Sequence, residues 1–105
     1  MPIYMRATLS VRTGHLQPLL ETLTTRVFPL IEREAGWKLL GCFSHLTGPI
    51  NTITDLWELP DHAALMKGRG ALAAAPDILD IRAVMNAAIQ EETLVIMDKV
   101  PYPYK

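Results

Sequence analysis

Two short stretches of the sequence place ionisable side chains beside aromatic ones. Tyr4 and Arg6 alternate with apolar residues near the start of the chain, and Asp55 precedes Trp57 by two positions. A buried guanidinium group needs a counter-charge or an anionic ligand. Arg6 and Tyr4 could therefore hold the carboxylate or enolate oxygen of a small apolar acid, with Asp55 acting as a base. A purely structural ion pair between Arg6 and Asp55 is the simpler alternative.

Two further residues extend this candidate site. Trp57 shares a strand face with Asp55 if the strand alternates, so its indole either walls the same cavity or packs in the core. His45 stands near the end of a β-rich run and is the best-placed histidine for proton transfer. Whether it shares a face with Asp55 depends on the hairpin register, which one residue of loop length would reverse. A hydrogen-bonded or exposed histidine without a catalytic role is the alternative.

Metal and cofactor chemistry have no comparable signal in the sequence. The chain has one cysteine, Cys42, and no His-x-x-x-His or Glu-x-x-His spacing that would bring metal ligands together. Gly68-Arg69-Gly70 lies in a helical stretch and not after a strand, which disfavours phosphate binding. We therefore expect no metal and no cofactor, and we interpret Cys42 as a small buried hydrophobe. Haem binding that depends on His45 is a minor alternative.

Composition limits the class of protein. The 105 residues are 50% hydrophobic and 20% charged, with a net charge of -1, which is typical of one compact soluble domain over residues 1–105. Without clustered cations we expect no nucleic-acid binding and no polybasic membrane anchor. No run approaches the roughly 20 apolar residues of a membrane span, and the first residues lack a signal-peptide pattern. Together with the single cysteine, these features indicate a cytoplasmic protein.

Alternating or β-branched composition predicts four strands. Residues 3–9 alternate strictly between apolar and polar types, and residues 93–97 form a last apolar strand. Residues 37–46 and 51–59 are two β-rich runs joined by Thr47-Gly48-Pro49-Ile50, which predicts a hairpin with a short loop. The prolines after residue 100 predict an irregular tail.

Helical periodicity predicts the connections between these strands. Apolar residues from Leu16 to Ile31 recur at spacings of three and four. Pro29 lacks an amide donor, so that helix should kink, or end and restart, near Phe28. A second helix starts near residue 62, and we expect Gly68 and Gly70 to leave it short or broken. A third helix covers residues 78–89.

The order strand, helix, strand, strand, helix, strand predicts a ferredoxin-like α+β fold, with helices on one face of an antiparallel sheet. Leu56, Trp57 and Val95 cannot all point at the helices, so the other face also carries apolar residues. Dimerisation through that face would bury them. Two such sheets would enclose a barrel whose interior is walled by side chains such as Tyr4 and Arg6.

The hairpin region contains the stretches Leu39-Leu40-Gly41-Cys42-Phe43, Gly48-Pro49-Ile50-Asn51 and Asp55-Leu56-Trp57-Glu58. The resemblance of these stretches is to the NIPSNAP family of the dimeric α/β-barrel superfamily. It extends to Ile3-Tyr4-Met5-Arg6, to Leu30 after Pro29, and to Arg69-Gly70-Ala71-Leu72 leading to Pro76. Asp55 stands where the family commonly has histidine, and Ile78 replaces an aromatic residue.

This resemblance implies a fold more than an activity. It favours an uncharacterised NIPSNAP-like homodimer that binds a small organic molecule in an apolar cavity, either between the sheet and the helices or at the dimer interface. We expect Tyr4, Arg6, Asp55 and Trp57 to line that cavity. The wider superfamily includes cofactor-independent monooxygenases, cyclases and isomerases, so an enzyme using Asp55 or His45 is one alternative. A non-catalytic protein-interaction module is the other.

Overall fold

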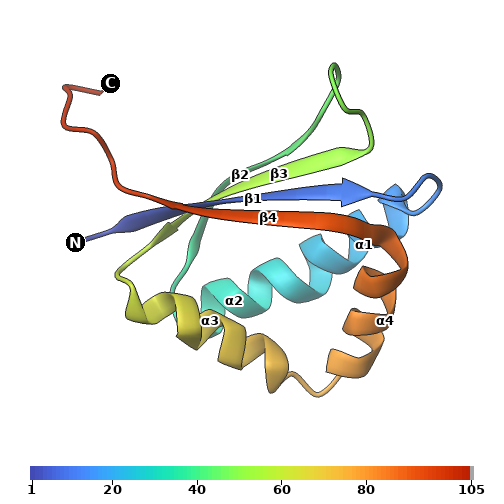
Figure 1. Cartoon of the computed structure of the whole chain (residues 1–105). Helices are drawn as coiled ribbons and strands as arrows, with labels where there is room; N and C mark the ends of the chain where they lie inside the picture. The colour runs from blue at the N-terminus through green and yellow to red at the C-terminus, as the bar shows by residue number, and fades with distance from the viewer. Residues whose placement is uncertain (105) are drawn as a thin grey trace.

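The structure, a computed structural model, describes residues 1–104. Its four-stranded antiparallel sheet has the strand order β2-β3-β1-β4, and the helices lie against one face of the sheet (Figure 1). The predicted ferredoxin-like α+β fold is therefore confirmed. In chain order, the elements are β1 (Ile3–Val11), α1 (Leu16–Thr22), η1 (Leu23–Val27), α2 (Phe28–Ala35), β2 (Lys38–Ser44), β3 (Thr52–Leu59), α3 (Ala63–Ala73), α4 (Ile78–Ala88) and β4 (Ile89–Met97).

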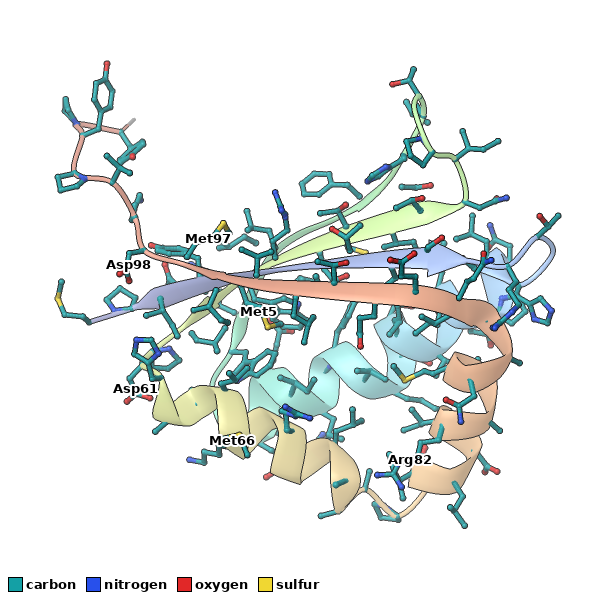
Figure 2. The ribbon with its side chains drawn as sticks, viewed as in Figure 1. Met5, Asp61, Met66, Arg82, Met97 and Asp98 are labelled. Carbon is teal, nitrogen blue, oxygen red and sulfur yellow. The ribbon has the colours of Figure 1, made fainter. Side chains whose placement is uncertain are left out.

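Alternation along the strands gives the sheet two distinct faces. Met5 of β1 points toward the helices and Met97 of β4 points away from them (Figure 2). We call the first the helix face and the second the open face. Register pairs share a face, and those of β1 place Tyr4 beside Glu58 and Met97. The open face carries, among others, Tyr4, Arg6, Phe43, Thr54, Leu56, Glu58, Val95 and Met97.

Three aromatic rings form the centre of the core under β3. The indole of Trp57, which is 1% exposed, meets the rings of Phe28 and Trp37 edge-on, with centroids 5.2 and 5.4 Å apart. Edge-to-face packing is favourable because the positive ring edge meets the negative ring face. These contacts fix α2 and the start of β2 against the sheet.

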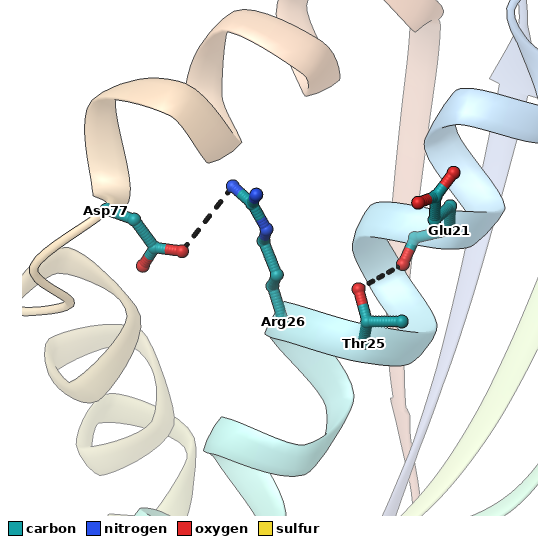
Figure 3. A network of polar contacts seen from close by, with 4 residues as sticks. All are labelled: Glu21, Thr25, Arg26 and Asp77. Atoms are coloured by element: carbon teal, nitrogen blue, oxygen red, sulfur yellow. Dashed lines mark hydrogen bonds and ion pairs between the residues drawn. The ribbon is translucent and has the colours of Figure 1, made fainter.

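The first helical segment changes its hydrogen-bond pattern at its centre. α1 leads into the π-helical turn η1, and the amide of Phe28 donates to the carbonyl of Leu23, five residues back. The hydroxyl of Thr25 donates to the carbonyl of Glu21 at 2.6 Å (Figure 3). In the same view Arg26 of η1 reaches Asp77, at the start of α4, over 3.5 Å. Both side chains of that ion pair are partly exposed, so it contributes little to stability.

Pro29 explains why the wide turn occurs here. Proline has no amide hydrogen, and its ring would crowd the carbonyl of Thr25 in a regular α-helix. A π turn just before Phe28 takes up this misfit without ending the helix. The irregularity that the sequence predicts near Phe28 is confirmed, and its form is a π turn.

The expectation of a short or broken second helix is wrong. α3 continues through both glycines to Ala73. Gly68 faces the indole of Trp37, whose Cζ2 would lie 2.5 Å from a Cβ atom at that position. The same indole donates a hydrogen bond to the carbonyl of Ala64 at 2.7 Å. Packing against Trp37 thus outweighs the low helix propensity of glycine.

The last strand also starts earlier than predicted. β4 begins at Ile89, and its polar residues Glu91 and Glu92 pair with Ser10 and Leu9 of β1. Because β4 is an edge strand, those polar side chains remain exposed while the backbone completes the sheet. Beyond the strand, residues 98–104 form neither helix nor strand, as predicted.

The two glycines of α3 give a matched test of this packing. We expect Gly68→Ala to lower the free energy of unfolding by about 1–3 kcal/mol, because the new methyl group must displace Trp37. Gly70→Ala meets no atom within 4 Å and should raise it by about 0.4–1 kcal/mol. Urea denaturation measures both. Equal effects of the two substitutions would contradict the contact between Gly68 and Trp37.

Candidate functional site

A cavity of about 310 Å³ lies between the helix face of the sheet and the helices. We call it the helix-side cavity. Its inner wall is apolar and buried, with Met5 and Ala7 from β1, Val27 from η1 and Trp37 before β2. A largely apolar concave space with a few polar groups is the usual form of a small-molecule site.

The cavity opens between α3 and the edge strand β4. The lining residues on that side are solvent-exposed, namely Arg69 of α3 and Glu92, Leu94 and Ile96 of β4. Leu94 and Ile96 keep 49% and 41% of their surface exposed although they belong to the helix face. The helices therefore leave β4 partly uncovered, and this gap forms the mouth of the cavity.

The π turn contributes directly to the cavity wall. Leu23 and Val27, the first and last residues of η1, both line the helix-side cavity. Single π turns within α-helices occur frequently at functional sites. The irregularity imposed by Pro29 therefore lies beside the space where a ligand would bind.

Asp55 lies on the helix face within the core. It is 5% exposed, and its Oδ2 accepts a 2.9 Å hydrogen bond from Nε1 of Trp57. Its Oδ1 has no hydrogen-bond partner among the described residues. Opposite it in the register stand Ala7 of β1 and Cys42 of β2. Ala7 lines the cavity, so the carboxyl group lies beside the cavity wall without itself forming part of it.

The surroundings of Asp55 favour its neutral form. Burial raises the pKa of Asp55 above its usual value, the hydrogen bond from Trp57 opposes that rise, and the charge of Glu92 adds to it. The pKa of Cys42 is also raised, first by burial and then by the charge of Asp55. A thiol with a raised pKa is a poor nucleophile at neutral pH, so Asp55 is the stronger candidate for proton transfer.

The open face holds a second, shallower depression. Tyr4, Leu40, Leu56 and Met97 line it together with residues that follow β4. The hydroxyl of Tyr4 donates to Oε1 of Glu58 at 3.2 Å. Burial and this hydrogen bond to Glu58 raise the pKa of Tyr4. Arg6 stands exposed on this face, opposite Leu56 and Val95.

His45 associates with the open face. Its Nε2 lies 2.7 Å from Oγ1 of Thr54, which pairs with Thr8 and Phe43 in the sheet. The side chain is partly buried beside the loop after β2. The hairpin register therefore places His45 and Asp55 on different sides of the sheet.

The structure divides the five candidate residues between the two faces. Asp55 and Trp57 share the helix face and a hydrogen bond, whereas Tyr4 and Arg6 occupy the open face. The ion pair between Arg6 and Asp55, which was the simpler alternative, is wrong, and so is a single site shared by Tyr4, Arg6 and Asp55. Arg6 pairs with Leu56 in the register, and alternation turns Asp55 to the opposite side. Of the five, only Tyr4 lines either depression.

Sequence patterns do not identify the charged residues at the mouth. Arg69 belongs to the Gly68-Arg69-Gly70 stretch that disfavours phosphate binding, and Glu92 precedes the strand predicted over residues 93–97. Continuing that alternation toward the amino terminus would have placed Glu92 on the same face as Leu94 and Ile96. No signal in the sequence indicates that Arg69 faces β4, because that depends on how α3 packs.

Two further findings concern the described residues alone. Among residues 1–104, no three histidine, cysteine, aspartate or glutamate side chains come close enough to hold a metal ion. In the same range no helix combines the length and apolarity needed to cross a bilayer.

The fold is that of a ferredoxin-like α+β protein. Its helices cover one face of the sheet and enclose the cavity, and they leave the other face open. Within that class the chain belongs to the NIPSNAP family, whose family model matches residues 4–103. No curated protein sequence matches the chain.

Solved structures share this fold at low sequence identity. A NIPSNAP family protein from Agrobacterium tumefaciens is 18% identical, with a TM-score of 0.82 over 99% of this chain and 96% of that one. An uncharacterised NIPSNAP domain protein from Burkholderia xenovorans is 21% identical, with a TM-score of 0.75 over 100% and 98%. A protein described as an antibiotic biosynthesis monooxygenase is 22% identical, with a TM-score of 0.68 over 94% and 99%.

The raised pKa of Asp55 predicts a pH-dependent effect of Asp55→Asn. An unfolded aspartate titrates near 3.8, so the folded protein binds the proton more tightly and loses stability as pH rises from there through the raised pKa. Asparagine carries no such charge. We therefore expect the free energy of unfolding of Asp55→Asn to increase relative to that of the unsubstituted protein as the pH rises from 4 to 7. Urea denaturation across that range measures it, and a constant difference would contradict the raised pKa of Asp55.

Proposed function

We propose that this NIPSNAP protein is a homodimer that binds a small, mainly apolar organic molecule in the helix-side cavity of each subunit. The observation that carries the proposal is the cavity itself, which is walled by buried apolar residues and opens to solvent beside α3. Cavities of this size, on the order of 300 Å³, are large enough for small organic ligands. The single cysteine suits a reducing compartment, and the proposal places the dimer in the cytoplasm.

The open face supports the dimer. Phe43 and Leu40 keep 56% and 44% of their surface exposed there, and Leu56, Val95 and Met97 extend the apolar area across the sheet. Monomeric proteins rarely expose a large contiguous apolar patch. A second copy packed on this face would bury it and enclose Tyr4 and Arg6 between the two sheets.

A substitution at the centre of the open face tests the dimer. We expect Leu56→Lys to convert a dimer into a monomer, because it adds a second cation next to Arg6 in the middle of the interface. Leu79→Lys is the control, since Leu79 is 77% exposed on α4, away from the sheet. Light scattering after size-exclusion chromatography gives the mass. A monomeric unsubstituted protein would overturn the dimer.

Native mass spectrometry of the untagged protein tests ligand binding. A dimer with a discrete extra mass would support a bound organic molecule, and an apolar probe should alter the fluorescence of Trp37 in the cavity wall. A dimer that carries no additional mass and binds no apolar probe would contradict the binding function. That outcome would favour a non-catalytic interaction module.

A second candidate is a cofactor-independent enzyme of the dimeric α/β-barrel type, a monooxygenase, cyclase or isomerase. The unpartnered Oδ1 of Asp55 favours it, since the register pairs Asp55 with Ala7 of the cavity wall. Burial raises the pKa of Asp55, which makes its carboxylate a stronger base than that of an exposed aspartate. His45 is the alternative base, and it would act between the two sheets.

Proton transfer by Asp55 can be followed by deuterium exchange at the carbon next to the carbonyl of a cyclic ketone. In heavy water we expect the protein to accelerate this exchange, and Asp55→Asn to abolish the acceleration while His45→Gln retains it. Proton NMR measures the rates. Acceleration that survives Asp55→Asn would remove Asp55 from the chemistry.

A further inference from the structure

We infer that the ligand of the helix-side cavity is a monocarboxylic acid with an apolar body, whose carboxylate binds Arg69 at the mouth. This inference rests on the proposed binding function and names the class of its ligand. The inference rests on Arg69, which is the one cationic side chain that lines the cavity among the described residues. Arg69 has no role in the core that would explain its place there.

The polarity of the cavity is concentrated at its mouth. Of the side chains that line it within residues 1–104, Arg69 and Glu92 alone are charged, and every other lining residue except Gly68 and Trp37 is aliphatic or a methionine. A ligand that fills the space must therefore keep its apolar part inside and its polar part between α3 and β4. Such an arrangement selects an amphipathic molecule with its head group at one end.

The guanidinium group of Arg69 is available to such a head group. The ion pairs found in the described part of the chain join Arg26 to Asp77 and Arg33 to Glu34, so neither uses Arg69 or Glu92. Arginine presents two parallel donors that match the two oxygens of a carboxylate. At the border of an apolar cavity this pairing is stronger than in open water, because less water competes for the donors.

The contact between Gly68 and Trp37 places Arg69 at the edge of the cavity. Gly68 lies against the indole of Trp37, which lines the cavity, so the backbone of α3 approaches the cavity wall closely at this point. Arg69, the next residue of α3, is exposed and lines the cavity.

Glu92 restricts the ligand to a single carboxylate. It lies across the mouth on β4, and its charge is near enough to contribute to the raised pKa of Asp55. A second carboxylate on the ligand would meet both the negative charge of Glu92 and the apolar wall, and both raise the free energy of binding. The pair Arg69 and Glu92 thus favours an acid with one carboxylate over a diacid.

Four ten-carbon probes separate these requirements, namely decanoate, 1-decanol, decanedioate and decylammonium. Titrations at pH 7 below the aggregation limit of each probe, followed by tryptophan fluorescence and calorimetry, give the affinities. We expect decanoate to bind about tenfold more tightly than 1-decanol, which corresponds to about 1.4 kcal/mol. The reason is that only the carboxylate can form charge-assisted hydrogen bonds with Arg69. Decanedioate and decylammonium should bind more weakly than decanoate.

Substitutions assign the preference to Arg69. Arg69→Gln should weaken decanoate binding about tenfold, to the level of 1-decanol, and leave 1-decanol unchanged. Arg82→Gln is the control, because Arg82 is exposed on α4 and does not line the cavity (Figure 2). Glu92→Gln should reduce the difference in affinity between decanoate and decanedioate. Thermal unfolding of each variant confirms that these exposed positions do not affect the fold.

The outcomes distinguish this inference from the proposed function. If neither decanoate nor 1-decanol binds, the binding function itself is wrong. If 1-decanol binds as tightly as decanoate, or if Arg69→Gln keeps the preference for decanoate, the cavity binds apolar molecules but the carboxylate inference fails. If decylammonium binds most tightly, Glu92 and not Arg69 selects the head group, and the inference is overturned.

Discussion

The strict alternation of side chains along β1 and β3 is the constraint on which the other features depend. Because Tyr4 and Arg6 point to one face, Met5 and Ala7 must point to the other, and the pairing with β3 carries the same division to Leu56 and Trp57. The helix face then supplies the core, the cavity wall and the buried carboxyl of Asp55. The open face receives the other half of these side chains, a mixture of apolar and ionisable groups that the proposed dimer would bury.

The sequence was sufficient for the fold because the fold follows from local patterns. Alternation in β1, the spacing of apolar residues in the first helix and the turn residues of the hairpin each point to the same arrangement of elements. The structure differs where a tertiary contact decides. The indole of Trp37 against Gly68 carries α3 through two glycines, and pairing with β1 extends β4 through polar residues.

The candidate site could be predicted only within one strand. Asp55 and Trp57 are two positions apart, so their common face follows from alternation alone, whereas the hydrogen bond between them depends on their side-chain conformations. The proximity of Arg6 and Asp55 required the register between two strands, and a shift of one residue separates them completely. The mouth of the cavity required still more, because it joins Arg69 of α3 to Glu92 of β4 and depends on the packing of a helix against a sheet edge.

The π turn fixes the number of residues between α1 and α2. A π turn corresponds to one residue more than an α-helical path needs, and each residue of an α-helix turns the chain by roughly 100°. Because η1 takes up that residue in one wider turn, α2 is spared the rotation of roughly 100° that an extra residue in a regular helix would cause. Phe28 therefore stays against the ring of Trp57, and Val27 stays in the cavity wall. A residue lost from η1 would remove the wide turn and return Pro29 to the crowded geometry of a regular helix.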